Sequence, residues 1–209
     1  SDLDKMTSGL QNSDLVIIAG RPSMGKTAFA MNIVEHTALN QDRPVLVFSL
    51  EMPANQLVVR MLSSLGKIDQ TRMRSGNLLE DDWPRLSSAA QKLKKASLYI
   101  DDTAGISPFE MKNRIKKFIR EEVERIRSEL PKDSDLNIDE IVNKSQPSLI
   151  VVDYLQLMNG TNASEGRVQE ISQISRELKG LARDYECPVI ALSQLSRNAV
   201  SYTHLTLPT

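Results

Sequence analysis

Eight residues near the start of the chain limit what it can fold into, because they spell the pattern G-x-x-x-x-G-K-[ST]: Gly20-Arg21-Pro22-Ser23-Met24-Gly25-Lys26-Thr27. They follow an apolar run, Leu15–Ala19, that predicts a buried strand, and a helical pattern begins at Lys26. The glycines let successive backbone N–H groups surround a phosphate, and the helix directs its positive end to the same place. The segment therefore predicts a strand, a phosphate-binding loop and a helix.

The same pattern assigns a role to each end of the loop. We expect Lys26 to reach the β- and γ-phosphates of a nucleotide and the Thr27 hydroxyl to hold Mg²⁺. The predicted nucleotide-binding residues are Gly20, Arg21, Pro22, Ser23, Met24, Gly25, Lys26, Thr27 and Ala28.

Composition narrows the class of protein further. The 209 residues suffice for one α/β domain, and the formal charge of −1 requires any nucleic-acid contact to come from a local patch or from several subunits together. The single Cys187 excludes a disulfide framework and predicts a small core residue. No apolar stretch approaches the roughly 20 residues of a membrane span, and the first residues lack a signal-peptide layout. We therefore expect a cytoplasmic protein without a membrane partner.

Apolar runs and helical patterns alternate along the chain. The expected strands are Leu15–Ala19, Val45–Leu50, a shorter Leu98–Ile100, Leu149–Val152 and Val189–Leu192, and the expected helices span 26–39, 54–65, 81–96, 108–130 and 167–185. This alternation predicts a wound, mostly parallel sheet that binds its ligand at the carboxyl ends of the strands. Helix 108–130 carries charges of both signs, which favours a solvated face over a nucleic-acid patch. Residues 131–147 are expected to be a polar surface excursion.

Hydrolysis of a nucleoside triphosphate needs a carboxylate near the metal and a group that activates water, both at strand ends beside the loop. Asp153 ends an apolar run in the manner of a Walker B strand, and Glu51, which ends the run Val45–Leu50, is the best candidate for the base. The alternatives are an ordinary strand-end acid for Asp153 and a helix-cap neighbour for Glu51. Asp101 and Asp102 compete for the metal role, although their strand is shorter.

Gln194 follows the last apolar run and is expected where that strand leaves the sheet near the γ-phosphate. There it either senses hydrolysis or is a surface amide that packs or binds water.

Read in order, several motifs resemble the motor domain of the DnaB family of bacterial replicative DNA helicases. They are residues 4–10 and 20–27, Phe48-Ser49-Leu50-Glu51-Met52, Tyr99-Ile100-Asp101-Asp102-Thr103, 153–158 and 192–197. The resemblance covers about residues 2–198. It implies a RecA-like core that uses ATP and Mg²⁺. It also implies a homohexameric ring that encircles single-stranded DNA, moves 5′ to 3′ and unwinds the duplex ahead, with a primase and a helicase loader as partners of the full-length protein.

By the same resemblance, Lys26, Glu51 and Gln194 are catalytic: Glu51 activates water and Gln194 couples the γ-phosphate to the DNA loops. Thr27 and Asp153 hold the metal. Residues 159–167 match the first DNA-facing loop, in which backbone N–H groups are expected to touch phosphates. Arg167 is the basic residue of this loop, and it is either a DNA contact or only the first residue of the following helix.

The sequence also departs from the family pattern. The family motor continues beyond position 197 with further strands and an arginine that completes a neighbour's site. We therefore expect residues 1–200 to be a motor domain that is incomplete at its C-terminus and weakly active alone. Residues 201–209 are expected to be a non-native tail, and we expect no counterpart of the family's amino-terminal primase-binding domain in these 209 residues. Two other functions stay open: a recombinase ATPase of the RecA or RadA type, and an ATP-gated assembly or loader module.

Overall fold

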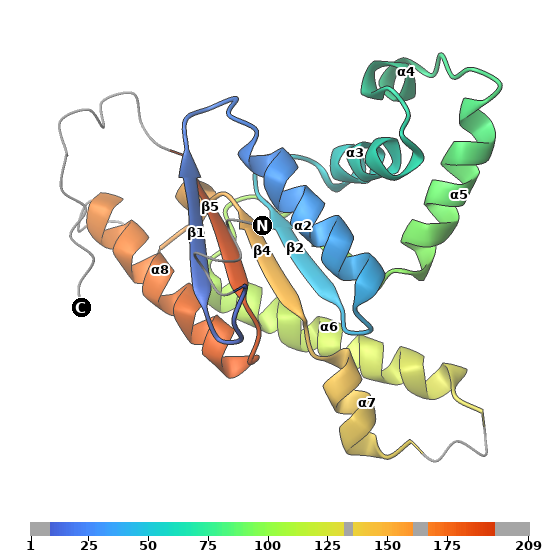
Figure 1. The fold of residues 1–209 in the computed structure, drawn as a ribbon. Coiled ribbons are helices and arrows are strands. Elements are labelled where there is room, and N and C mark those ends of the chain that lie inside the picture. The colour runs from blue at the N-terminus through green and yellow to red at the C-terminus, as the bar shows by residue number, and fades with distance from the viewer. Residues whose placement is uncertain (1–8, 132–135, 161–166, 195–209) are drawn as a thin grey trace.

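The computed structural model describes residues 9–131, 136–160 and 167–194, the last range without the side chains of residues 167 and 168. Within these ranges a five-stranded sheet lies between two layers of helices (Figure 1). The strands are β1 (Leu15–Gly20), β2 (Val45–Ser49), β3 (Leu98–Asp101), β4 (Leu149–Asp153) and β5 (Val189–Gln194). The helices are α2 (Lys26–Asn40), α3 (Ala54–Gly66), α4 (Gln70–Ser75), α5 (Asp82–Lys95), α6 (Pro108–Glu129), α7 (Ile138–Ser145), the 3-10 helix η1 (Leu155–Leu157) and α8 (Arg167–Asp184).

The order of the strands places all the predicted site segments at one edge. The strands lie in the order β1-β5-β4-β2-β3, and each neighbouring pair is parallel. In this register Ser49 lies beside Asp153, and Gly20 lies beside Gln194. Parallel strands end at the same edge, where open α/β sheets bind their ligands. The loop after β1, the turn after β2 and the ends of β4 and β5 therefore meet.

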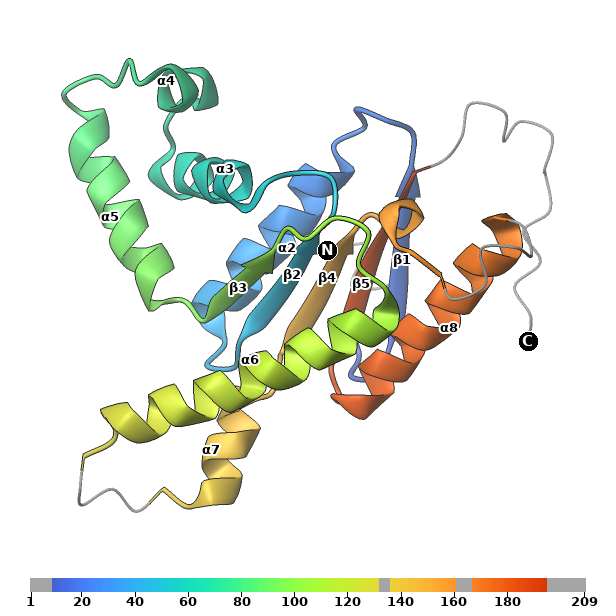
Figure 2. The same ribbon diagram turned by 180° about the vertical axis from the view of Figure 1, so that it is seen from behind.

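The two faces of the sheet belong to two separate hydrophobic clusters. Along β2, Leu46 and Phe48 pack with residues of α6 and α8, whereas Val45 and Val47 pack with residues of α2 and α3. Figures 1 and 2 show α2 on one side of the sheet and α6 and α8 on the other. Because β2 and β4 are buried on both faces, they appear in the sequence as continuous apolar runs.

The α/β class, the five strands and the five predicted helices are confirmed, with bounds that differ by one or two residues at most ends. The polar excursion predicted for 131–147 is wrong in part, since this segment contains α7. Asn137 and Glu140 form a capping box at its start, and Ile141 is buried. The short helix α4 was also not predicted; Asp69 caps it by accepting from the N–H groups of Thr71 and Arg72.

Ion pairs cover the charged helix α6. Arg114 pairs with Asp101 at 2.7 Å, and Arg125 pairs with Glu122 at 2.6 Å and with Glu129 at 2.7 Å. These contacts agree with the prediction of a solvated helix face of mixed charge.

Cys187 is buried, as predicted, and burial raises the pKa of its thiol to about 12. In the part of the chain that the structure describes, no helix is both long and apolar enough to traverse a bilayer. Most of the first motif, residues 4–8, and the tail 201–209 lie outside the described residues.

Candidate nucleotide-binding site

The loop between β1 and α2 has the backbone of an anion-binding turn. Gly25 has a φ of 81° and Ser23 a φ of 62°, and Gly25 stands at the N-cap of α2. No side chain caps the helix there, and its first turn contains no acidic residue. The N–H groups at the start of α2 are therefore available to an external anion, with the positive end of the helix dipole behind them.

Lys26 bridges this loop through two hydrogen bonds. Its Nζ donates to the carbonyl oxygens of Gly20 at 2.8 Å and Arg21 at 3.1 Å. The stem of the lysine passes so close to Gly20 that a Cβ there would lie 3.3 Å from the lysine Cδ. A glycine at position 20 thus leaves room for the lysine to cross the loop.

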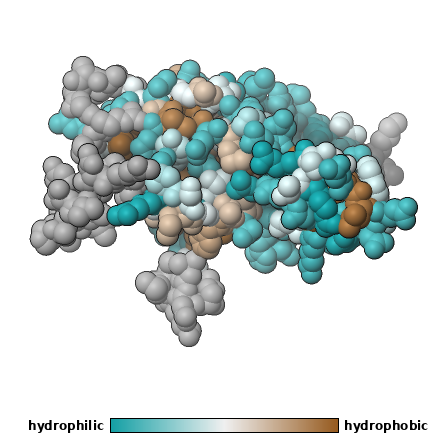
Figure 3. Space-filling view, turned by 90° about the horizontal axis from the view of Figure 1, so that it is seen from above, coloured by the Kyte–Doolittle hydropathy of each residue, from teal (hydrophilic) through white to brown (hydrophobic). Residues whose placement is uncertain are grey.

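A cavity of about 410 Å³ opens beside this loop at the carboxyl edge of the sheet. It is lined by Lys26, Thr27, Glu51, Asp153 and Gln194, all of which the sequence predicted. Pro22, Ser23, Gly25 and Ala28 also line it, whereas Gly20, Arg21 and Met24 do not. Viewed from this edge, the described surface is mainly hydrophilic with separate hydrophobic patches (Figure 3). Such a polar opening suits a charged ligand.

Thr27 and Asp153 form an oxygen-rich pair at the bottom of the cavity. The Thr27 hydroxyl donates to Oδ2 of Asp153 at 2.8 Å, and Asp153 is only 4% exposed. Burial raises the pKa of Asp153, and the charge of Glu51 adds to this, while the Thr27 hydrogen bond and the charges of Lys26 and Arg60 oppose it. A buried carboxylate of this kind gains from a cation beside it.

The donor set fits Mg²⁺ bound together with phosphates. Hydroxyl and carboxylate oxygens are the ligands that Mg²⁺ prefers, and it is usually held by one or two protein groups plus substrate phosphates and water. The described residues contain no group of three or more His, Cys, Asp or Glu side chains that could hold a metal ion.

Glu51 lies on a short turn between β2 and α3 that is fixed from both sides. The Ser49 hydroxyl donates to the Met52 carbonyl at 2.6 Å, and Asp102 accepts from the Ala54 N–H at 2.9 Å. The Glu51 side chain is exposed to the cavity and is therefore accessible to water.

Asp101 and Asp102, the competing candidates for the metal, do not line this cavity. Burial raises the pKa of Asp101, but hydrogen bonds from Thr103 and from the Arg114 guanidinium outweigh it and hold the pKa below its ordinary value. Asp102 instead accepts a hydrogen bond from the first N–H of α3. Asp101 ends β3, the edge strand of the sheet, and Asp102 follows it, so the structure places Asp153 and not these two acids in the cavity.

Gln194 ends β5 and is held there by a residue that the sequence did not single out. The side chain of Gln156 accepts from the Gln194 N–H at 3.1 Å and donates to the Gln194 carbonyl at 3.1 Å and to the Ser193 hydroxyl at 2.8 Å. The Gln194 amide itself makes no hydrogen bond within the described part of the chain and faces the cavity. Gln156 thus positions the backbone from which Gln194 projects.

Arg60 is the second site residue that sequence reasoning missed. It lies on α3, lines the cavity and acts electrostatically on Asp153. An arginine in a helix pattern carries no signal of its own, so only the packing of α3 beside the loop reveals its position.

The predicted DNA contact cannot be placed in the same way. Arg167 is the first residue of α8, but its side chain, like residues 161–166 of the preceding loop, lies outside the described part of the structure. The loop's start is fixed by the Gly160 N–H, which donates to Glu170 at 2.9 Å.

Comparison with known proteins gives consistent matches. The family model described as DnaB-like helicase C terminal domain matches residues 1–128 and 132–204. The chain is 47% identical over 198 residues to Replicative DNA helicase DnaB of Buchnera aphidicola subsp. Acyrthosiphon pisum, and 46% identical over 198 residues to Replicative DNA helicase DnaC of Bacillus subtilis. Each alignment covers 94% of this chain but 38% of the relative. The chain thus spans well under half the length of these relatives.

Two solved structures match it over 97% of its length at 32% identity. One is a DnaB-like replicative helicase, described with its interactions with primase, which has a TM-score of 0.74 and is covered over 44% of its chain. The other is an ATPase domain, with a TM-score of 0.75 and 64% covered.

Proposed function

The chain belongs to the DnaB-like helicase C terminal domain family and has its RecA-like fold, and from this premise we propose that it is the ATP-hydrolysing motor of a replicative DNA helicase. One observation carries the proposal: a single cavity gathers Lys26 and Thr27 from the start of α2, Glu51 from the turn after β2 and Asp153 from the end of β4. Phosphate binding, metal binding and water activation are thereby combined in one place.

In this proposal the loop binds the triphosphate through the N–H groups at the start of α2. Lys26 exchanges its two loop carbonyls for phosphate oxygens, which is favourable because an ammonium binds an anion more strongly than a neutral carbonyl. Thr27 and Asp153 would hold Mg²⁺. When bound, Mg²⁺ supplies positive charge that offsets the charge of the phosphates in the transition state.

Hydrolysis forms a bond from a water oxygen to the γ-phosphorus and breaks the bond from that phosphorus to the bridging oxygen. Glu51 is proposed to accept the proton of the attacking water, because it is the exposed carboxylate of the cavity. Arg60 and Lys26 add positive charge to the cavity, and the free amide of Gln194 is proposed to sense the terminal phosphate.

At the level of the whole protein, we propose a homohexamer that encircles single-stranded DNA and moves 5′ to 3′, with a primase and a loader as partners. The relatives' names as replicative helicases and the primase interactions of the solved structure support this. Arg167 is the proposed DNA contact of the loop before α8. Electron microscopy of the chain with an ATP analogue and oligo-dT tests the assembly: rings support it, and helical filaments favour a recombinase.

The experiment that tests the nucleotide site is calorimetric titration with Mg²⁺ and a non-hydrolysable ATP analogue. Lys26→Ala is expected to weaken binding at least about 100-fold, because it removes the charge that crosses the loop. Lys94→Ala, an exposed lysine of α5, is the control and should bind like the original chain. Glu51→Gln should bind the analogue but not hydrolyse ATP. A folded chain that fails to bind the analogue contradicts the proposal.

A further inference from the structure

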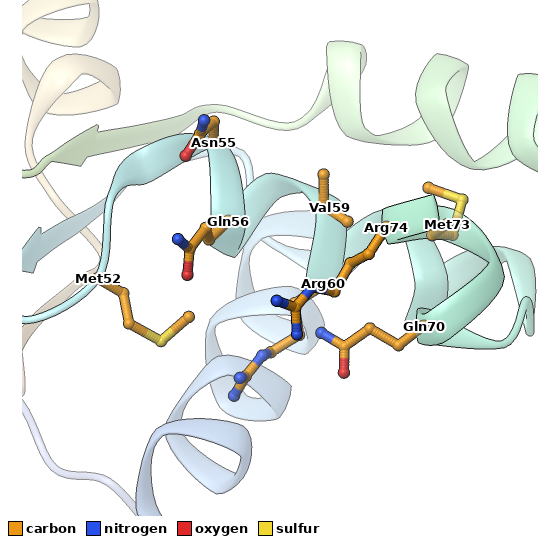
Figure 4. A pocket seen from close by; sticks show the side chains of 8 residues that line it. All are labelled: Met52, Asn55, Gln56, Val59, Arg60, Gln70, Met73 and Arg74. Carbon is orange, nitrogen blue, oxygen red and sulfur yellow. The ribbon is translucent and has the colours of Figure 1, made fainter. Parts of the chain in front are cut away.

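A second cavity lies beside the nucleotide cavity, between α3 and α4. It measures about 260 Å³ and shares two of its lining residues, Met52 and Arg60, with the nucleotide cavity. We call it the α3–α4 groove; Figure 4 labels the eight residues that line it. It is smaller than the 410 Å³ of the nucleotide cavity, so it suits a small ion better than a second nucleotide.

The polar lining of the groove consists of hydrogen-bond donors suited to an anion. Arg60 and Arg74 contribute guanidinium groups, and Asn55, Gln56 and Gln70 contribute amides. None of the eight lining residues is acidic. Figure 4 shows Arg60 on α3 and Arg74 and Gln70 on α4 directed toward the same space. Guanidinium forks match tetrahedral oxyanions such as phosphate geometrically as well as in charge.

Neither arginine makes an ion pair with the described residues, although Arg60 acts electrostatically on Asp153 of the nucleotide cavity. Arg60 Nε is buried and makes no hydrogen bond, and the Arg74 guanidinium has no hydrogen bond or ion pair to the described residues. Arg72, on the same helix as Arg74, and Arg85 of α5 both pair with Asp82, although Arg72 Nε, like Arg60 Nε, is buried without an acceptor. Two cations in one groove repel each other, and a buried donor without an acceptor is costly. An anion between them would relieve both effects.

We propose that the α3–α4 groove binds orthophosphate and that the phosphate split from ATP leaves the nucleotide cavity through it. The exit route rests on the proposed function, whereas the binding site does not. The shared wall argues for this ligand over a carboxylate or a DNA phosphate, because Arg60 faces both cavities and can pass an oxyanion from one to the other.

Binding is tested by NMR titration of the chain with orthophosphate while the nucleotide cavity is filled with Mg²⁺ and a non-hydrolysable ATP analogue. The side-chain amide signals of Asn55, Gln56 and Gln70 are expected to shift saturably. Arg74→Gln should weaken this binding about tenfold or more, and Arg74→Lys, which keeps the charge, should restore part of it. Arg127→Gln, an exposed arginine of α6 outside the groove, is the control.

Three results overturn the binding site: no saturable shift, equal affinity in Arg74→Gln, or acetate or oligo-dT binding the groove as tightly as orthophosphate. Lys26→Ala separates this inference from the proposed function. That variant should no longer bind the nucleotide but should still bind orthophosphate at the groove amides. The two binding sites can therefore be tested independently.

The exit route is tested by comparing ATP cleavage, measured after rapid quenching, with phosphate release, measured by a fluorescent phosphate-binding reporter. Arg74→Gln should slow release several-fold relative to cleavage, because the groove no longer attracts the departing anion. If release keeps pace with cleavage in a variant whose groove binding is weakened, phosphate leaves by another path.

Discussion

Asp102 holds the start of α3, and with it the turn that carries Glu51, from a segment far along the chain. Its carboxylate accepts from the Ala54 N–H, the first of the helix, and Pro53 at the N-cap contributes no side-chain cap. We therefore predict that Asp102→Ala destabilises the fold slightly and slows ATP hydrolysis without weakening nucleotide binding, because the loop and Lys26 are untouched.

The size of the effect follows from the contacts. Loss of a helix-capping acceptor costs about 1 kcal/mol, and Asp102 is exposed, so water replaces part of the lost bond. About 1 kcal/mol changes an equilibrium roughly fivefold, since about 1.4 kcal/mol corresponds to a factor of ten. The Ser49 hydroxyl still holds the Met52 carbonyl at 2.6 Å. We expect the hydrolysis rate to fall about three- to fivefold.

Urea denaturation, calorimetric binding of an ATP analogue and single-turnover hydrolysis measure the three quantities separately. Asp102→Asn keeps an acceptor and should resemble the original chain in all of them. Asn137→Ala removes the cap of α7, where Asn137 accepts from the Glu140 N–H at 2.8 Å, and should cost similar stability without slowing hydrolysis. The reasoning is refuted if Asp102→Ala loses stability yet hydrolyses ATP at the original rate, or if Asn137→Ala slows hydrolysis equally.

Three further predictions concern buried polar groups. Burial raises the pKa of Asp153 above its ordinary 3.8, so the nucleotide-free fold loses stability as pH rises from 3.8 through the raised pKa. Asp153→Asn should therefore raise the melting temperature at neutral pH, and this difference should vanish below about pH 3.8. The same variant should weaken Mg²⁺-dependent nucleotide binding. Gln156→Ala should speed hydrogen exchange of the Gln194 N–H about fivefold, as expected for loss of a bond worth about 1 kcal/mol. Arg85→Ala should lower the free energy of unfolding by about 2 kcal/mol in urea, because Asp82, fully buried, keeps only Arg72 at 3.5 Å and one backbone donor; an unchanged midpoint contradicts this.

The sequence predicted those helices and strands whose own residues are enough to specify their secondary structure. β2 and β4 are buried on both faces, so their apolar runs are continuous and hard to mistake. The helix α4 is only 6 residues long and α7 only 8, too short for a helical period to show. Their caps were readable nonetheless: Asn137 and Glu140 have capping-box spacing, and Asp69 stands directly before α4.

The predictable residues of the site are likewise those that a local motif or a strand end identifies. Lys26 and Thr27 belong to a contiguous motif, and Glu51, Asp153 and Gln194 end strands, so the parallel topology alone brings them to one edge. This positional rule predicts which residues face the cavity, but it does not test the chemical role of each.

The residues that support the site could not be found in this way, because their partners are distant in sequence. Asp102 and Ala54 are 48 positions apart, and Gln156 and Gln194 are 38 apart, and neither pair has a fixed spacing that a motif could encode. In the sequence Arg60 is an ordinary helical arginine. Only the packing of α3 in the structure shows that Arg60 lines both cavities. The same helix therefore begins at the Glu51 turn and, within two turns, reaches the α3–α4 groove.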